Sequence, residues 1–243
     1  MSALVLNTRS KNQAGEFTAL LQNAKFDVLE IPALEISKLN FSNQVVVALE
    51  ELDSSDIVAV TSANAAIFVG EDPRVRQLLK NTTVAAVGTK TGAMLRQNGI
   101  AVQLQSAQSN SEELADLIAA QRPKKVLYLS GIPNTGTLKD KLAGISDFIE
   151  IPVYTSAPSA TLSRDIAQYK VELEKVDYLV FLSREALLAF DYAAESVGKT
   201  FKDRPCIVIS NRVADAAREL GYKKIFISQA QLIEGIVTLL VSL

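Results

Sequence analysis

Short apolar runs alternate along the chain with segments in which apolar residues recur at helical spacing. The runs are bounded by polar or turn residues and cover 3–8, 57–61, 84–87, 126–129, 178–182 and 207–209. Continuous apolar runs of this length are typical of strands that are buried on both faces of a parallel sheet. Because the runs alternate with helical segments, we predict an α/β fold built on parallel, doubly wound sheets.

Helix starts can also be predicted from the pattern. Leu114, Leu117 and Ile118 have helical spacing, and Ser109 with Glu112 has the spacing of a capping box, which predicts a helix that begins at Ser109. Ser62, Ser183 and Thr91 stand where further helix N-caps are expected.

The chain repeats itself at an offset of about 120 residues. Glu30-Ile31-Pro32 recurs as Glu150-Ile151-Pro152, and the segment 58–62 corresponds to 179–183. Gly99 and Gly221, each after a helical segment, also correspond, as do Leu114, Leu117 and Ile118 with Ile236, Leu239 and Leu240. We interpret the chain as two similar α/β lobes that arose by duplication.

The two Glu-Ile-Pro copies are candidate crossings between the lobes. Proline lacks an amide donor and keeps the preceding residue extended, so each copy is an expected edge strand or extended linker. If the two copies pair as a two-stranded β-ladder hinge, the lobes are interleaved. Residues 1–33 then begin the first lobe, 34–150 form the second, and 151–243 hold the return linker and the rest of the first. We expect a cleft between the lobes and a flexible hinge.

Composition excludes several classes of function. The chain of 243 residues has 48% hydrophobic residues, a net charge of -2 and no histidine. The absence of histidine excludes a Ser-His-Asp relay and a histidine-ligated zinc. No segment has the roughly 18 apolar residues that a membrane span needs, and the charge gives no sign of nucleic-acid binding. Cys206 is the single cysteine, and we interpret it as a core residue of a cytoplasmic protein.

Nucleotide binding has no support from the glycine residues. The nearest glycine cluster, Gly88 to Gly92, fits neither a Walker loop nor a G-x-G-x-x-G motif. An enzyme with two Rossmann-like lobes that binds a dinucleotide or nucleotide sugar is therefore a weak alternative.

Six segments together give the chain a family resemblance over its whole length. They are Asn7-Thr8-Arg9, Val60-Thr61-Ser62-Ala63-Asn64, Ala86-Val87-Gly88-Thr89-Lys90-Thr91, Leu127-Tyr128-Leu129-Ser130-Gly131, Ile151-Pro152-Val153-Tyr154-Thr155 and Leu182-Ser183. In this order and spacing the chain resembles the uroporphyrinogen-III synthases. The resemblance implies two α/β lobes joined by a two-stranded ladder, an active site in the cleft between them, and no cofactor and no metal.

The resemblance also implies a substrate and a reaction. The family acts on hydroxymethylbilane, a linear tetrapyrrole that carries acetate and propionate groups and is therefore a polyanion. Loss of its terminal hydroxyl as water gives an electrophilic azafulvene, and the ring closes through a spiro intermediate with the last ring, ring D, inverted. Such a synthase is a lyase of haem biosynthesis. We expect a monomer that binds neither nucleic acid nor a membrane and that makes transient contact with the preceding enzyme of the pathway.

The candidate site residues follow from the resemblance and from their positions after predicted strands. Tyr154 matches the tyrosine that the family places beside the cleft, and it is the one candidate catalytic residue, as a hydrogen-bond donor to the leaving oxygen. The ends of parallel strands and the helix N-termini beside them can hold carboxylates without a basic protein. The candidate substrate ligands are Arg9, Ser62, Asn64, Gly88, Thr91, Ser130, Gly131, Ser183, Ser210 and Arg212.

Each candidate also has a structural interpretation. Ser62, Ser183 and Thr91 could serve only as helix caps. Tyr154 could be a β-favouring aromatic residue of the linker, and Arg9 could form an ordinary surface ion pair.

The chain departs from the family pattern at two places. The family's Ile-Gly-Pro-Thr-Thr-Ala is replaced by 209–214, where Ser210 and Arg212 stand among changed residues, and Lys139 occurs in the stretch where an arginine often follows Gly131. These changes leave open which groups bind the carboxylates. They also leave open a non-catalytic bilobal α/β sensor or binding module for a small anionic ligand, which would share the fold and differ in turnover.

Overall fold

The computed structural model describes residues 2–107 and 110–243. It divides into two compact units, the first made of Met1–Ile36 with Ala157–Leu243 and the second of Ser37–Ser156. Each unit is a sheet covered by helices on both faces, so the predicted α/β class with parallel sheets is confirmed.

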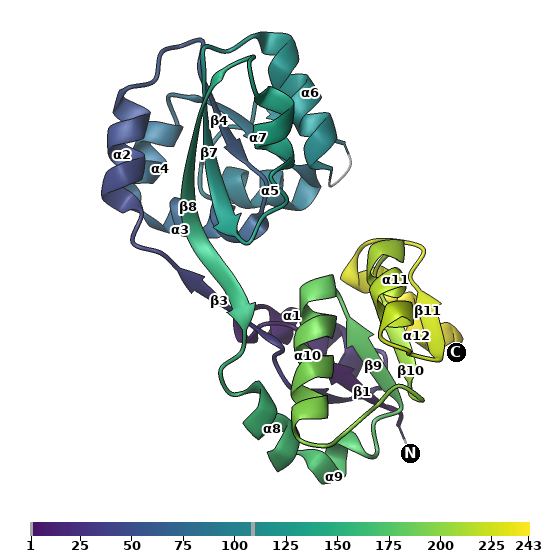
Figure 1. Cartoon of the computed structure of the whole chain (residues 1–243). Coiled ribbons are helices and arrows are strands. Elements are labelled where there is room, and N and C mark those ends of the chain that lie inside the picture. The colour runs from purple at the N-terminus through teal and green to yellow at the C-terminus, as the bar shows by residue number, and fades with distance from the viewer. Residues whose placement is uncertain (1, 108–109) are drawn as a thin grey trace. The chain divides into compact units, whose positions relative to one another are not determined.

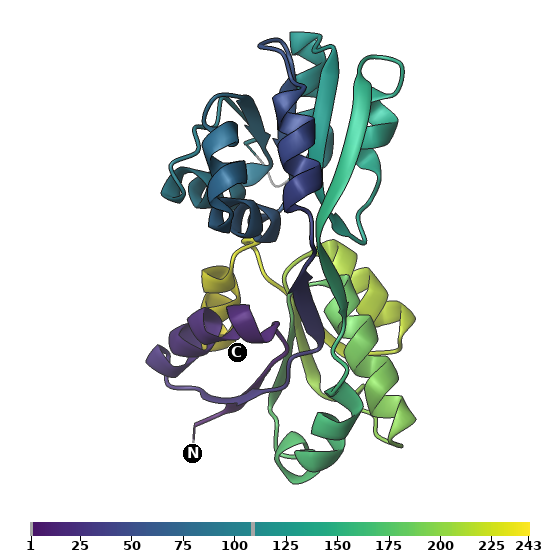
Figure 2. The same cartoon turned by 90° about the vertical axis from the view of Figure 1, so that its left-hand side faces the viewer.

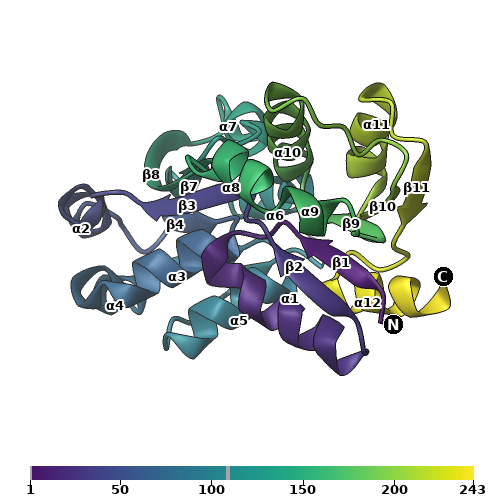
Figure 3. The same ribbon diagram turned by 90° about the horizontal axis from the view of Figure 1, so that it is seen from below.

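The first unit contains a five-stranded parallel sheet. Its strands lie in the order β11-β10-β9-β1-β2, which are Lys224–Ile227, Pro205–Val208, Tyr178–Phe181, Leu4–Asn7 and Asp27–Glu30. One face is covered by α1 (Lys11–Asn23) and α12 (Ile233–Ser242). The other face is covered by α8 (Leu162–Gln168), α9 (Lys170–Leu173), α10 (Arg184–Ser196) and α11 (Asn211–Glu219), as Figure 3 shows.

The second unit contains a six-stranded sheet. Its strands lie in the order β3-β8-β7-β4-β5-β6, which are Leu34–Lys38, Asp147–Pro158, Lys125–Ile132, Ile57–Val60, Thr83–Ala86 and Leu104–Gln105. Figure 1 labels the first four of these strands. One face is covered by α2 (Ser42–Glu50), α3 (Ala63–Glu71), α4 (Pro73–Leu79) and α5 (Gly88–Gln97). The other face is covered by α6 (Ser111–Gln121) and α7 (Thr137–Leu142).

The internal repeat corresponds to a repeat of strands. The matching strands start 120 to 122 residues apart, at Leu4 and Lys125, Asp27 and Asp147, Ile57 and Tyr178, Thr83 and Pro205, and Leu104 and Lys224. In each sheet, the first two strands of one repeat lie beside the last three strands of the other repeat. Each unit therefore combines parts of both repeats, as expected if two copies of one α/β sequence exchanged their first strand pair.

Strands β3 and β8 are neighbours (Figure 2), and the division of the chain into two units falls within both strands. The Leu39 amide donates to the Val153 carbonyl, and the Ser159 amide donates to the Ala33 carbonyl, both at 3.0 Å. The higher-numbered residue on the β3 side, Leu39, is bonded to the lower-numbered residue on the β8 side, Val153. The two strands therefore run antiparallel. The pairing partner of β8 thus follows the first Glu-Ile-Pro copy and is not that copy itself.

Each Glu-Ile-Pro copy was expected to be an edge strand or an extended linker, and the second copy is extended but does not stand at a sheet edge. Glu30 ends the edge strand β2, but Pro152 lies inside β8, which has a neighbour on each side. The ladder shifts register between Ser130 and Gly131, directly beside Pro152. This irregularity accommodates a residue that has no amide hydrogen to donate.

Two predicted helix caps are wrong. Asn110, and not Ser109, is the N-cap of α6, where its side chain accepts a hydrogen bond from the Glu112 amide at 2.8 Å; Ser109 itself lies outside the described residues. Thr91 lies in the fourth position of α5, because that helix begins three residues earlier at Gly88. Ser62 and Ser183 are N-caps, as predicted.

Helices in the part of the chain that the structure describes are all too short or too polar to cross a membrane.

Candidate functional site

Tyr154 lies on β8 in the second unit, where its side chain is half-buried. Its ring packs beside the Phe68 ring, with the two centroids 6.1 Å apart. The Tyr154 hydroxyl donates a hydrogen bond of 2.9 Å to the Ser62 Oγ. The candidate catalytic residue is therefore fixed by a specific partner and is not a loosely held aromatic side chain of a linker.

Ser62 follows β4 and is the N-cap residue of α3. Its backbone is extended, and its Oγ accepts a hydrogen bond of 3.1 Å from the amide of Asn64, the second residue of that helix. This bond satisfies one of the amides that a helix leaves unpaired at its N-terminus. The structure thus brings together three of the predicted site residues, Ser62, Asn64 and Tyr154.

Gly131 forms the wall against which the Tyr154 ring lies. A β-carbon at residue 131 would overlap the ring, so the ring occupies space that only a glycine leaves free. The Asn134 side-chain amide donates to the Gly131 carbonyl at 3.2 Å and to the Glu150 carboxylate at 2.8 Å. These bonds tie the end of β7 to β8 and hold the wall in place.

A second hydroxyl pair lies beside the first and was not predicted. Thr61 Oγ1 and the Tyr128 hydroxyl are 2.8 Å apart, so each of two consecutive hydroxyl residues after β4 is bonded to a tyrosine. Burial raises the pKa of Tyr128, which is 6% exposed. The sequence offered a signal, since consecutive hydroxyl residues directly after a buried strand are well placed for such pairs, but it did not name their partners.

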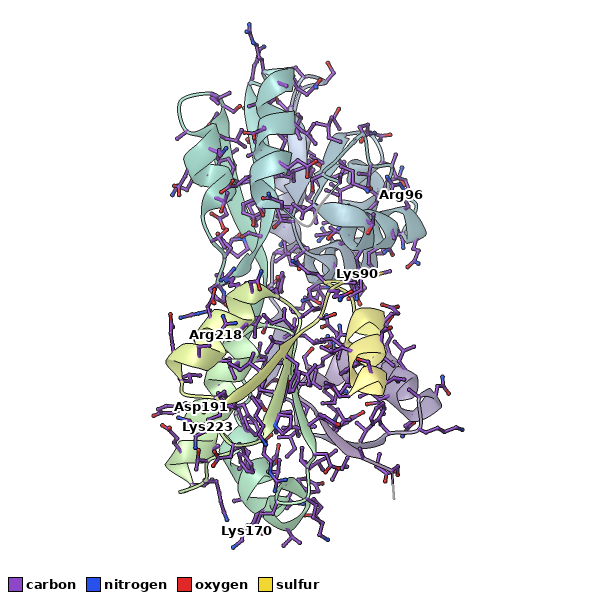
Figure 4. All side chains as sticks on the ribbon, turned by 90° about the vertical axis from the view of Figure 1, so that its right-hand side faces the viewer. Lys90, Arg96, Lys170, Asp191, Arg218 and Lys223 are labelled. Atoms are coloured by element: carbon purple, nitrogen blue, oxygen red, sulfur yellow. The ribbon has the colours of Figure 1, made fainter. Side chains whose placement is uncertain are left out.

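Gly88 and Thr91 lie at the start of α5. Gly88 has a φ of 66°, and its amide donates to the Ser106 Oγ at 3.1 Å. Thr91 is 5% exposed and faces the interior of the unit. Lys90 lies between them in this first turn, and Figure 4 labels it together with Arg96 in the last turn of the same helix. Ligand binding by Gly88 or Thr91 stays a prediction.

Ser130 is completely buried on β7. Its Oγ has no hydrogen-bond partner among the residues that the structure describes. A buried hydroxyl without a partner is unusual, because the loss of its hydrogen bonds to water is not compensated. Its predicted contact with substrate stays a prediction.

Ser183, Ser210 and Arg212 lie at helix N-termini of the first unit. Ser183 is the N-cap of α10, and its Oγ accepts from the Ala186 amide at 3.1 Å. Ser210 precedes α11 without a side-chain capping bond. The Arg212 side chain is 66% exposed and lies 3.6 Å from the Glu185 carboxylate, so the two helices α10 and α11 meet through an exposed ion pair.

Arg9 follows β1 in the first unit, and its side chain is only 11% exposed. Its Nη2 donates to the Gln13 Oε1 at 3.2 Å, and its Nη1 lies 4.0 Å from the Glu16 carboxylate. Nη1 has no hydrogen bond within the described residues. Burial lowers the pKa of Arg9, against the opposing effect of Glu16. The interpretation of Arg9 as an ordinary surface ion pair is wrong, because the guanidinium is mostly buried and poorly paired.

The candidate site residues offer chiefly hydrogen-bond donors and acceptors. Within 2–107 and 110–243, no three carboxylate or cysteine side chains come close enough to form a metal site. Cys206, the single thiol, lies buried in β10, and burial raises its pKa to about 12. It is therefore protonated at neutral pH and a poor nucleophile. What the second unit provides chemically is a hydroxyl network at a strand end.

Three comparisons relate the chain to known proteins. Residues 15–238 match the model of the family described as uroporphyrinogen-III synthase HemD. A relative from Methanocaldococcus jannaschii, named "Putative uroporphyrinogen-III synthase", is 27% identical over 237 residues, which are 95% of each chain. A crystal structure of a mutant uroporphyrinogen III synthase from Thermus thermophilus superimposes with a TM-score of 0.65 at 16% identity, over 98% of this chain and 96% of that chain. The wild-type enzyme in another crystal form gives 0.50 at 17% identity, over 99% and 97%.

Proposed function

The chain belongs to the uroporphyrinogen-III synthase family, and we propose that the hydroxyl network around Tyr154 is the part of the protein that assists the chemical step. The function is that of an enzyme of tetrapyrrole biosynthesis. As a lyase, it would convert hydroxymethylbilane to uroporphyrinogen III with loss of water. The fold supports this function through its match to solved members of the family.

The reaction needs little covalent help from a protein. The carbon–oxygen bond of the terminal hydroxymethyl group breaks as the pyrrole nitrogen contributes its lone pair, and the departing oxygen takes up a proton to become water. The azafulvene that forms is attacked by the substituted carbon of ring D, and the spiro intermediate then fragments and recloses with that ring inverted. Electrophile and nucleophile belong to one molecule, so the protein must mainly fold the substrate and stabilise the leaving oxygen.

The observation that carries the proposal is the hydrogen bond between Tyr154 and Ser62. It places two hydroxyl groups side by side at the end of β4 and on β8, both half-buried, so that a ligand can reach them. Hydroxyl donors of this kind stabilise negative charge on a departing oxygen. The buried, protonated Cys206 offers no competing nucleophile.

Binding of the polyanion is proposed to use backbone amides and hydroxyls rather than many basic side chains. Ser62, Gly88, Ser183 and Ser210 stand at helix N-termini, where amides and the helix dipole favour carboxylates. Arg212 adds one exposed positive charge. A net charge of -2 is compatible with such binding because the donors act locally.

Location and assembly are part of the same proposal. A cytoplasmic protein is supported by the single buried thiol, which leaves the chain without a disulfide of its own. We propose a monomer that needs no cofactor and makes transient contact with the enzyme that supplies hydroxymethylbilane, because that substrate closes spontaneously to the type I isomer if it is released for long.

Product analysis tests the function. The protein is supplied with freshly generated hydroxymethylbilane, the products are oxidised, and the type III and type I isomers are separated by chromatography. An excess of type III over the enzyme-free control is the expected result. Type I alone from folded protein would contradict the proposal and would favour a binding module that shares the family fold.

A further inference from the structure

Ser62 accepts two hydrogen bonds at once. One comes from the Asn64 amide at 3.1 Å and the other from the Tyr154 hydroxyl at 2.9 Å. A serine hydroxyl has two acceptor lone pairs and one hydrogen to donate. Both acceptor positions are therefore filled, and only the hydrogen of the Ser62 hydroxyl is left for another group.

Within the part of the chain that the structure describes, the Ser62 hydroxyl takes part in these two bonds only as an acceptor and donates no hydrogen bond of its own. The Ser62 side chain is half-buried and not sealed, so the hydrogen can reach a ligand. The hydrogen of the Tyr154 hydroxyl, in contrast, is already used in the bond to Ser62. The geometry thus assigns the outward donor to the serine and not to the tyrosine.

The two incoming bonds also strengthen the serine as a donor. Hydrogen bonds in a chain polarise one another, so an oxygen that accepts two of them releases its own hydrogen more readily to an acceptor. The neighbouring Thr61 is less suited to this role, because either oxygen of its pair with Tyr128 could be the donor, and the Tyr128 side chain is 6% exposed.

We propose that Ser62 presents the hydrogen-bond donor to the departing hydroxyl of the substrate, and that Tyr154 is a positioning residue that acts through Ser62. The proposal rests on the proposed function. In this step the carbon–oxygen bond of the substrate breaks and both electrons go to oxygen. The proton that completes the water comes through solvent and is balanced by loss of the pyrrole N–H proton. Ser62 keeps its own proton and stabilises the charge on oxygen, so nothing in the protein is consumed.

A double-mutant cycle separates this route from direct action of Tyr154. The variants are Ser62→Gly, Tyr154→Phe and the double variant, and kcat and KM for type III formation are measured for each. Glycine is tolerated at an N-cap almost as well as serine, so α3 should form without the hydroxyl. Loss of a donor to a developing oxyanion lowers kcat by roughly 10²-fold.

The proposal expects a specific pattern. Ser62→Gly lowers kcat by about 10²-fold with little change in KM, Tyr154→Phe lowers it by about tenfold, and the double variant equals Ser62→Gly. Ser62→Thr, which keeps a hydroxyl and a cap, restores most of the rate. If the double variant is slower than Ser62→Gly by the full Tyr154→Phe factor, Tyr154 contacts the substrate independently and the proposal is overturned.

Two controls keep the result interpretable. Asn110→Ala removes a comparable N-cap bond from α6 in the same unit, and it should leave kcat unchanged. Wild-type protein must first produce type III isomer, because its absence would contradict the function itself. Wild-type turnover together with an unchanged kcat in Ser62→Gly would overturn only the role of Ser62.

Discussion

Gly131 lies so close to the Tyr154 ring that a β-carbon on residue 131 would come within 2.5 Å of the Tyr154 hydroxyl oxygen. The hydrogen bond between Tyr154 and Ser62 therefore depends on Gly131, whose contribution is the space that it leaves for the ring. The position of the Tyr154 ring is thus determined by the absence of a side chain at residue 131 as well as by the contacts that the ring makes.

The first prediction concerns Gly131→Ala. The added methyl group must displace the Tyr154 ring, which breaks the 2.9 Å bond to Ser62. We expect kcat to fall about tenfold, as in Tyr154→Phe, and the unfolding free energy to fall by about 1–3 kcal/mol from overpacking. Steady-state kinetics and urea unfolding measure the two effects.

Gly15→Ala is the matched control for this exchange. Gly15 lies in α1, and no atom lies within 4 Å of the place that a β-carbon would take, so alanine fits there and should stabilise the helix by about 0.5–1 kcal/mol. Its kcat should equal that of the wild type. A Gly131→Ala variant with wild-type kcat would show that the ring position does not matter for turnover.

The second prediction concerns Arg9, which is 11% exposed and has one nitrogen without a hydrogen bond within the described residues. A buried cation with incomplete pairing contributes little to stability, and an apolar side chain of similar size is often tolerated in its place. We expect Arg9→Met to change the melting temperature by only a few degrees, and to raise KM about tenfold if Arg9 serves a substrate carboxylate. Unchanged KM together with a large loss of stability would assign Arg9 a purely structural role.

The apolar runs predicted six of the seven inner strands, missed the inner strand β8, whose burial is mixed, and predicted the edge strands poorly. The six apolar runs correspond to β10, β9 and β1 in one sheet and to β7, β4 and β5 in the other, all of which lie inside their sheets. Strands β3, β6 and β11 lie at sheet edges, where one side is exposed to solvent and a continuous apolar run is not needed. Hydrophobic pattern reports burial, so it identifies a strand only where both faces are covered.

The sequence predicted which residues belong to the candidate site but not which hydrogen bonds join them. Ser62 could be recognised as a helix cap, and Tyr154 was singled out by family resemblance. Their hydrogen bond joins residues 92 positions apart and depends on the pairing of β8 with β7 and on the register shift beside Pro152. No local pattern encodes such a contact, because it is a product of the packed sheet.

The third prediction uses the single thiol as a probe of burial. Cys206 is completely buried, and burial raises its pKa to about 12 from an ordinary value near 9. Between these two values the unfolded chain loses the thiol proton and the folded chain keeps it, so stability falls as pH rises, by up to about 1.4 kcal/mol per pH unit. Below pH 9 this contribution to stability is fully present.

Urea unfolding at pH 8 and pH 10.5 measures this dependence. Cys206→Ala should be less stable at both values because it loses packing, but it should lose less stability between them than the wild type. In native protein at pH 8 the thiol should resist a thiol-labelling reagent and should react fully in urea. Rapid labelling of folded protein would contradict the burial of Cys206.

The last prediction concerns Asp191 on α10, which Figure 4 labels. Asp191 is 5% exposed, and its carboxylate lies 3.4 Å from the Lys202 amine. Burial and the charge of Asp191 raise the pKa of the neighbouring Tyr222. Asp191→Ala removes the buried hydrogen-bond partner of Tyr222, while Lys202 keeps Glu195, so we expect a loss of about 1–3 kcal/mol of unfolding free energy.

Glu195→Gln provides the control on the same helix and the same lysine. Glu195 also binds Lys202, at 2.7 Å, but its side chain is 56% exposed, so water screens the pair. The shorter bond should therefore contribute less, about 0.5 kcal/mol, because exposure to solvent decides the worth of an ion pair more than its length does. Urea unfolding of both variants measures the difference. Equal losses of unfolding free energy in the two variants would mean that Asp191 is as well solvated as Glu195. That result would contradict the burial of Asp191 in the structure.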